Sequence, residues 1–111
     1  MDITTTNYNS CDMVKASGRI DSQTAPALTD AFKALTDASK YNIVFDMNDV
    51  DFISSKGVWV LMETQKECKK LSRGELVIAN ANDKIQHSLD LAGLKHFFKI
   101  FDDVTAAVGN F

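Results

Sequence analysis

The feature that most constrains the fold is the apolar run Ile43-Val44-Phe45, which precedes an acidic segment and then a long helical pattern. A continuous apolar run over residues 41–47 is typical of a central strand that is buried on both faces. From Ser55 to about Ser72, apolar residues that include Leu71 recur at helical spacing along one side, which we expect to be buried, and charged residues occupy much of the other. Ser54 and Ser55 stand where this helix is expected to begin, after a short acidic loop. The sequence therefore predicts a buried strand, a loop and a long helix that starts at a pair of hydroxyl groups.

The rest of the chain alternates between strand and helix patterns. Strands are expected over residues 3–8, 13–20, 75–79 and 98–101, and helices over residues 21–38, 82–93 and from about 103 onward. Gly18 indicates a bulge or a close backbone approach within its strand, and Gly74 is expected to end the long helix. Strand–helix–strand crossovers imply parallel neighbours, and the opening hairpin adds an antiparallel edge. We expect one α/β domain over residues 1–111, with a mixed sheet of four or five strands and about four helices.

Composition and charge exclude several classes of function. The chain has 111 residues and a net charge of −3, which argues against nucleic acid as the main partner because phosphate binding needs a surplus of Lys and Arg. Cys11 and Cys68 are the only cysteines, and their spacing suggests neither a metal site nor a redox motif. The N-terminus lacks the features of a signal peptide, and the apolar run at 58–62 is too short to span a membrane. We therefore expect a reduced, cytoplasmic protein without a metal or cofactor.

The chain resembles the STAS domains, the family of anti-sigma factor antagonists, along nearly its whole length. A strand, an acidic stretch, two serines, a glycine and a long helix follow one another as in the family signature. The segments that carry the resemblance are Asp46-Met47-Asn48-Asp49-Val50-Asp51-Phe52-Ile53-Ser54-Ser55-Lys56-Gly57-Val58, Gly18-Arg19-Ile20-Asp21, Leu91-Ala92-Gly93-Leu94 and Phe98-Lys99-Ile100-Phe101.

The resemblance implies a phosphorylation switch on a non-enzymatic protein. In the family, a serine two residues before the motif glycine, which is Ser55 here, is phosphorylated by a partner that is both a serine kinase and the anti-sigma factor. The unphosphorylated antagonist binds this partner, phosphorylation releases the antagonist, and a metal-dependent serine phosphatase restores it. Ser54 stands where many members have Asp, so two neighbouring hydroxyls are available as acceptors. Ser54 is the second choice, and it is otherwise interpreted as an ordinary loop hydroxyl. From the residues alone, the first interpretation of Ser55 is a plain helix N-cap, and only the resemblance favours it as a phosphate acceptor.

Five further residues are candidates for binding the partner. Lys56 either points to water or pairs with a phosphate or with carboxylates of the partner. Gly57 is expected to make room for the backbone of the partner. Trp59 is either a core residue or an exposed binding anchor. The resemblance places Asp21 and Asp46 near the serine loop, although either could simply be a cap or turn residue.

A second interpretation is a constitutive STAS subunit of a transporter or signalling complex, in which Ser55 is only a cap. An enzyme has no support, because the chain lacks a Gly-rich phosphate loop, a nucleophile–base pair in a sensible context and paired carboxylates. Some relatives bind nucleotides weakly, but no motif here indicates such binding. The sequence does not predict the oligomeric state.

Overall fold

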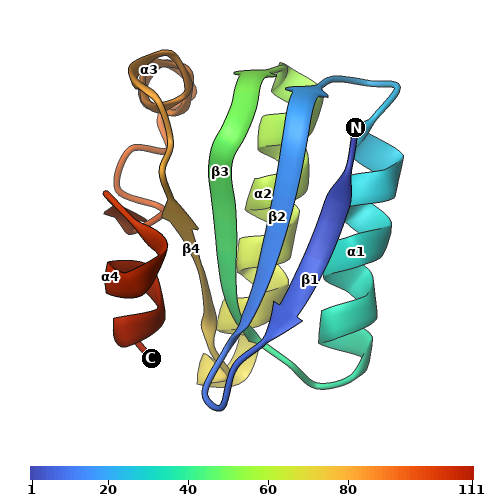
Figure 1. The fold of residues 1–111 in the computed structure, drawn as a ribbon, viewed down its shortest axis with the longest axis vertical. Coiled ribbons are helices and arrows are strands. Elements are labelled where there is room, and N and C mark those ends of the chain that lie inside the picture. The colour runs from blue at the N-terminus through green and yellow to red at the C-terminus, as the bar shows by residue number, and fades with distance from the viewer.

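Five strands form one mixed sheet in the order β1-β2-β3-β4-β5, in a computed structural model that describes residues 1–111 (Figure 1). The first two strands are antiparallel, and the other neighbours are parallel. The strands are β1 (Ile3–Asn7), β2 (Asp12–Ile20), β3 (Asn42–Ile53), β4 (Glu75–Ala79) and β5 (Ile100–Phe101). The helices are α1 (Ala25–Asp37), α2 (Ser55–Lys69), the 3₁₀ turn η1 (Lys70–Ser72), α3 (Asp83–Leu91) and α4 (Val104–Gly109). The expected fold class is confirmed.

Helices cover both faces of the sheet. On one face, α1, α2 and α3 enclose the larger core of 22 buried residues, whose strand members include Val14, Phe45 and Ile78. On the other face, α4 covers a smaller cluster of five buried residues over the β3–β4 half of the sheet. Figure 1 shows α1 and α2 behind the sheet and α4 beside β4. The central strands are buried from both sides, which explains their continuous apolar runs.

The acidic segment before the serines is part of β3 and not a loop, so that expectation was wrong. β3 extends to Ile53 because β2 continues to pair with it, as far as the Ile20–Ile53 pair. Two register shifts, one on each side of Ser17–Gly18, let the strands stay paired, and Gly18 has a φ of +89°. The predicted irregularity at Gly18 is therefore confirmed. Asn48, Asp49 and Asp51 are exposed, whereas Val50 and Ile53 are buried.

Two helix ends differ from those expected. α1 begins at Ala25 and not at Asp21, because the Asp21 carboxylate accepts hydrogen bonds from the next backbone N–H groups and closes a turn first. α2 ends at Lys69, and the left-handed residues after it are Leu71 and Ser72 rather than Gly74. Leu71, expected on the buried side, is 86% exposed. Gly74 is required for space, because a Cβ there would collide with the carbonyl group of Tyr41.

Candidate functional site

The candidate site lies where β2 and β3 end and α2 begins. The backbone N–H of Ser54 donates to the carbonyl oxygen of Ile20 at 2.8 Å, so the last residue of β2 is held beside the start of α2. In open α/β sheets, ligands bind outside the carboxyl ends of the strands. The loops after β2, β3 and β4 all leave this edge of the sheet. The site is therefore at the place where the fold allows a binding function.

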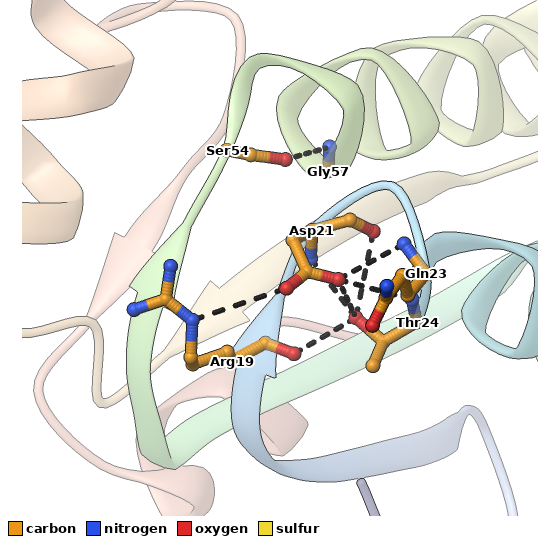
Figure 2. Close-up of polar contacts among 6 residues, drawn as sticks. All are labelled: Arg19, Asp21, Gln23, Thr24, Ser54 and Gly57. Atoms are coloured by element: carbon orange, nitrogen blue, oxygen red, sulfur yellow. Dashed lines mark hydrogen bonds and ion pairs between the residues drawn. The ribbon is translucent and has the colours of Figure 1, made fainter.

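The two serines have different roles. Ser54 is the N-cap of α2, and its Oγ accepts a hydrogen bond from the Gly57 N–H at 3.3 Å (Figure 2). Ser55 is the first residue of the helix; it is exposed, and its hydroxyl makes no hydrogen bond within the chain. The interpretation of Ser55 as a cap is therefore wrong, and so is that of Ser54 as an ordinary loop hydroxyl. A phosphate on Ser55 would not remove the hydrogen bond that starts the helix.

Asp21 lies beside the Ser54 loop, as expected, and organises the turn after β2. Its Oδ1 accepts hydrogen bonds from the backbone N–H groups of Gln23 at 3.0 Å and Thr24 at 3.2 Å, and Thr24 Oγ1 also approaches it at 3.3 Å (Figure 2). Its Oδ2 is 3.9 Å from Arg19 Nε. The Gln23 and Thr24 backbone hydrogen bonds, with the Thr24 hydroxyl and the Arg19 charge adding to them, lower the pKa of Asp21. The carboxylate thus stays ionised and holds the turn beside the serines.

Asp46 does not belong to this site, so its expected position was wrong. It lies in the middle of β3, opposite Lys15 of β2, whereas the end of β3 lies opposite Ile20. Five residues of β2, or roughly 17 Å, therefore separate Asp46 from the end of β3. Asp46 is 5% exposed and accepts hydrogen bonds from the Asn48 N–H and from Asn80 Nδ2, both at 3.0 Å. Its role is to join β3 to the end of β4. No local pattern indicates this pairing, because Asn80 is 34 residues away along the chain.

Lys56 and Trp59 lie together on the first turn of α2. Trp59 is 48% exposed, and Lys56 Nζ is 4.7 Å from the centroid of its ring, within the range of a cation–π contact. Trp59 is thus a surface residue next to Ser55 rather than a core residue. A second pair of this kind, Arg19 over Phe52 at 4.2 Å, lies at the ends of β2 and β3 and was missed from the sequence. Arg19 and Phe52 lie side by side because the register of β2 and β3 pairs them. This register could not be predicted from the sequence.

Gly57 serves internal packing, in place of the expected contact with a partner. It is buried, and a Cβ on it would lie 2.6 Å from Ile20 Cγ2 and 2.7 Å from Ile53 Cγ1. Only glycine lets the start of α2 approach the ends of β2 and β3 this closely. Gly57 therefore holds the Ser54–Ser55 turn against the sheet.

An apolar groove of about 520 Å³ opens beside Ser55. One wall is the first two turns of α2, and the other is the end of α3 with the turn that follows it. Seven of its ten lining residues are hydrophobic and none is charged; they are Ile53, Ser54, Ser55, Val58, Trp59, Met62, Ser88, Leu91, Ala92 and Leu94. Leu91 is 76% exposed. The wall formed by the end of α3 was not predicted to be part of a site. The signal that could have indicated it is an apolar residue, Leu91, on the outer side of a short helix.

Two classes of structure are not found in the chain. No three His, Cys, Asp or Glu side chains come together in a way that could bind a metal ion. None of the helices combines the length and the apolar character needed to cross a bilayer.

Comparisons with known proteins confirm the resemblance drawn from the sequence. A model of the STAS domain family matches residues 2–107. A Bordetella bronchiseptica protein, provisionally named as the anti-sigma factor antagonist BtrV, is 26% identical over 94 residues, which is 85% of this chain and 80% of that protein. The crystal structure of an anti-sigma factor antagonist from Mycobacterium paratuberculosis has a TM-score of 0.88 at 25% identity and covers 98% of this chain and 92% of that chain. A sulfate transporter family protein from Wolinella succinogenes shares the fold, with a TM-score of 0.71 at 19% identity over 88% of this chain and 81% of that chain.

Proposed function

Because the chain belongs to the STAS domain family, we propose that it is an anti-sigma factor antagonist controlled by phosphorylation of Ser55. Unphosphorylated, it binds an anti-sigma factor that is also a serine kinase, and it thereby frees a sigma factor. Phosphorylation of Ser55 by this partner releases it, and a metal-dependent serine phosphatase resets it. A protein with these partners would act in the cytoplasm. The protein itself catalyses no reaction.

The observation that carries the proposal is the free, exposed hydroxyl of Ser55 beside a capped helix start. A kinase must bring the acceptor oxygen in line with the phosphate it transfers, so the acceptor has to be accessible. Ser55 meets this condition, whereas the Ser54 hydroxyl is engaged with the Gly57 N–H. We therefore favour Ser55 over Ser54 as the acceptor.

The start of α2 tolerates the modification. A phosphate adds about −1.5 to −2 charges and three acceptor oxygens. The positive end of the helix dipole favours such a charge by about 0.3–1 kcal/mol. Lys56, adjacent in sequence, carries a cation that can turn from the Trp59 ring toward the phosphate. The phosphorylated protein should therefore remain folded.

The groove supplies the reason why the partner is released. Its uncharged walls suit apolar side chains of a partner, with exposed Trp59 as the anchor. Lys56 and the helix start favour acidic groups next to those apolar side chains. A dianion on Ser55, a lining residue of the groove, would repel such a surface by several kcal/mol. Since each 1.4 kcal/mol is tenfold in affinity, we expect affinity to fall by about 10²–10³.

The test uses a purified candidate anti-sigma kinase from the same genome. Incubation with ATP should add one phosphate to the wild type and to Ser54→Ala, and none to Ser55→Ala, as measured by intact mass and peptide mapping. Calorimetry should show that Ser55→Asp binds the kinase at least tenfold more weakly than Ser55→Ala, while both melt within a few degrees of the wild type. A phosphate on Ser54 alone, or equal affinities of the two variants, would refute the mechanism.

A constitutive STAS subunit is the second candidate, favoured by the fold shared with the sulfate transporter family protein. In that case Ser55 would accept no phosphate from any kinase of the genome. Ser55→Asp would then leave the affinity for the assembly unchanged. The same mass and binding measurements thus decide between the two functions.

A further inference from the structure

Gln65 is a fully buried amide in the third turn of α2, with every hydrogen-bonding group in use. Its Oε1 accepts from the Leu76 N–H at 2.6 Å, and its Nε2 donates to the carbonyl oxygens of Leu76 at 2.9 Å and Phe97 at 3.0 Å. Its exposed fraction is 0%. A buried amide that satisfies three backbone groups at once is not interchangeable with an apolar residue of similar size.

The amide takes the place of a missing strand residue. β5 pairs with β4 only at Ile78 and Ala79, and the Ile78 N–H donates to the Lys99 carbonyl. Alternate residues of a parallel strand direct their backbone groups to the same neighbour, so the N–H and C=O of Leu76 point to this same side. β5 has not yet begun opposite Leu76, so no strand residue is there to pair with it. The Gln65 side chain forms the two hydrogen bonds that a residue of β5 would otherwise form. Without it, two buried backbone groups would have no partner.

The third hydrogen bond connects the two walls of the groove. Phe97 belongs to the turn after α3, and its N–H donates to the carbonyl oxygen of Leu94, a lining residue of the groove, at 3.0 Å. The Gln65–Phe97 hydrogen bond is the only one that joins α2 to residues 83–99. The wall that carries Leu94 is thus joined by a single hydrogen bond to the helix that carries Ser55 and Trp59. Its other contacts with α2 are apolar packing and the approach of Lys69 Nζ to the Phe97 ring at 5.9 Å, and neither fixes a direction as a hydrogen bond does.

We propose that Gln65 is a positioning residue for partner binding, which sets the spacing between the two walls of the groove. It makes no contact with the partner itself. The effect of Gln65 on affinity for the partner rests on the proposed function. Its effect on the position of the turn at 94–97 does not. Loss of the amide should loosen the turn at 94–97 and leave α2, Ser55 and the rest of the sheet in place.

The test compares three variants of the full chain by NMR hydrogen exchange. Gln65→Met keeps the shape of the side chain and removes all three hydrogen bonds. It should lower the protection factors of the Leu94 and Phe97 amides about tenfold more than those of the β2 and β3 amides. Gln86→Met is the matched control, since the exposed Gln86 bonds only to the nearby Ala81 carbonyl. Acrylamide quenching of Trp59 should rise in the first variant and not in the control.

Gln65→Glu adds a second measurement, the pH dependence of the protection factors, which would not change if Gln65 only filled space. An ionised carboxylate accepts from the Leu76 N–H but donates to neither carbonyl, so the turn should loosen when the carboxyl is ionised. Burial raises the pKa of a carboxyl group, to about 8–9 in fully buried cases, and the protonated form donates one hydrogen bond again. The local protection factors should therefore recover at least threefold as the pH falls from about 9 to about 5.

The outcomes separate this inference from the proposed function. A uniform loss of protection across the sheet, or protection of Leu94 and Phe97 that neither variant changes, would overturn the positioning role. With the inference correct, Gln65→Met should weaken binding of the kinase at least tenfold, and phosphate should still be found on Ser55. Absence of phosphate on Ser55 in the wild type would refute the proposed function and leave the exchange result to decide the role of Gln65.

Discussion

Replacing Ser54 and Ser55 by alanine, one at a time, should separate stability from modification. Ser54→Ala removes the only side-chain cap of α2, and such losses typically cost about 0.5–2 kcal/mol. The Ser54 Oγ–Gly57 N distance of 3.3 Å is slightly longer than an ordinary N–H···O hydrogen bond, so we expect a value in the lower half, about 0.5–1 kcal/mol. For a domain of 111 residues, 1 kcal/mol corresponds to about 4 °C in melting temperature. Ser55→Ala removes no hydrogen bond, and its effect should stay below about 0.5 kcal/mol.

Urea unfolding followed by circular dichroism measures both values, with the slope of the transition as a check that the unfolded states are alike. Ser54→Asp is the matched control, because aspartate is as good an N-cap as serine and its charge suits the start of a helix. It should restore the stability of the wild type at pH 7 and lose this advantage when its carboxyl is protonated near pH 3. A larger loss in Ser55→Ala than in Ser54→Ala would show that the capping hydroxyl has been assigned to the wrong serine.

Three further predictions follow from the geometry. Burial raises the pKa of the Cys68 thiol to about 12 and that of Cys11 above its ordinary value, so neither should react with Ellman's reagent at pH 8 until the protein is unfolded. Asp21 has a lowered pKa in the folded state, so its stabilising effect should be present above about pH 4 and be lost as the pH falls through the folded pKa; Asp21→Asn should show a shallower acid transition than the wild type. Gly57→Ala should destabilise by about 1–3 kcal/mol through overpacking against two isoleucine side chains, whereas Gly109→Ala, with open space around its Cβ, should be neutral or stabilising in the same thermal melts.

The order of strands and helices could be predicted because it depends on local patterns. Apolar runs, helical periodicity and the irregularity at Gly18 are each encoded within a few residues. The acidic end of β3 was missed because its exposed polar residues look like a loop until pairing with β2 is known. The end of α2 was missed for a related reason, since Leu71 looks like a core residue by spacing and is exposed by a left-handed turn.

The candidate site could be predicted only in part, because contacts between residues far apart in the sequence leave no local pattern. The serine pair and Asp21 could be placed together because the resemblance covers both segments. The difference between Ser54 and Ser55 could not be predicted, because either hydroxyl can cap a helix that starts one residue earlier or later. The hydrogen bonds of Gln65 could not be predicted, because they depend on where β5 begins, more than 30 residues downstream.

The division of work between the adjacent serines explains how such a switch can act without unfolding the domain. If the acceptor hydroxyl were also the cap, phosphorylation would alter the hydrogen bond that starts the helix, and release of a partner would be coupled to a loss of stability. Here the cap accepts from the Gly57 N–H, and the neighbouring hydroxyl has no structural duty. A phosphate on Ser55 would lie next to backbone N–H groups that already favour an anion, so under the proposed function the modification would be close to neutral for the fold. Its full cost would then fall on the partner surface that covers the groove.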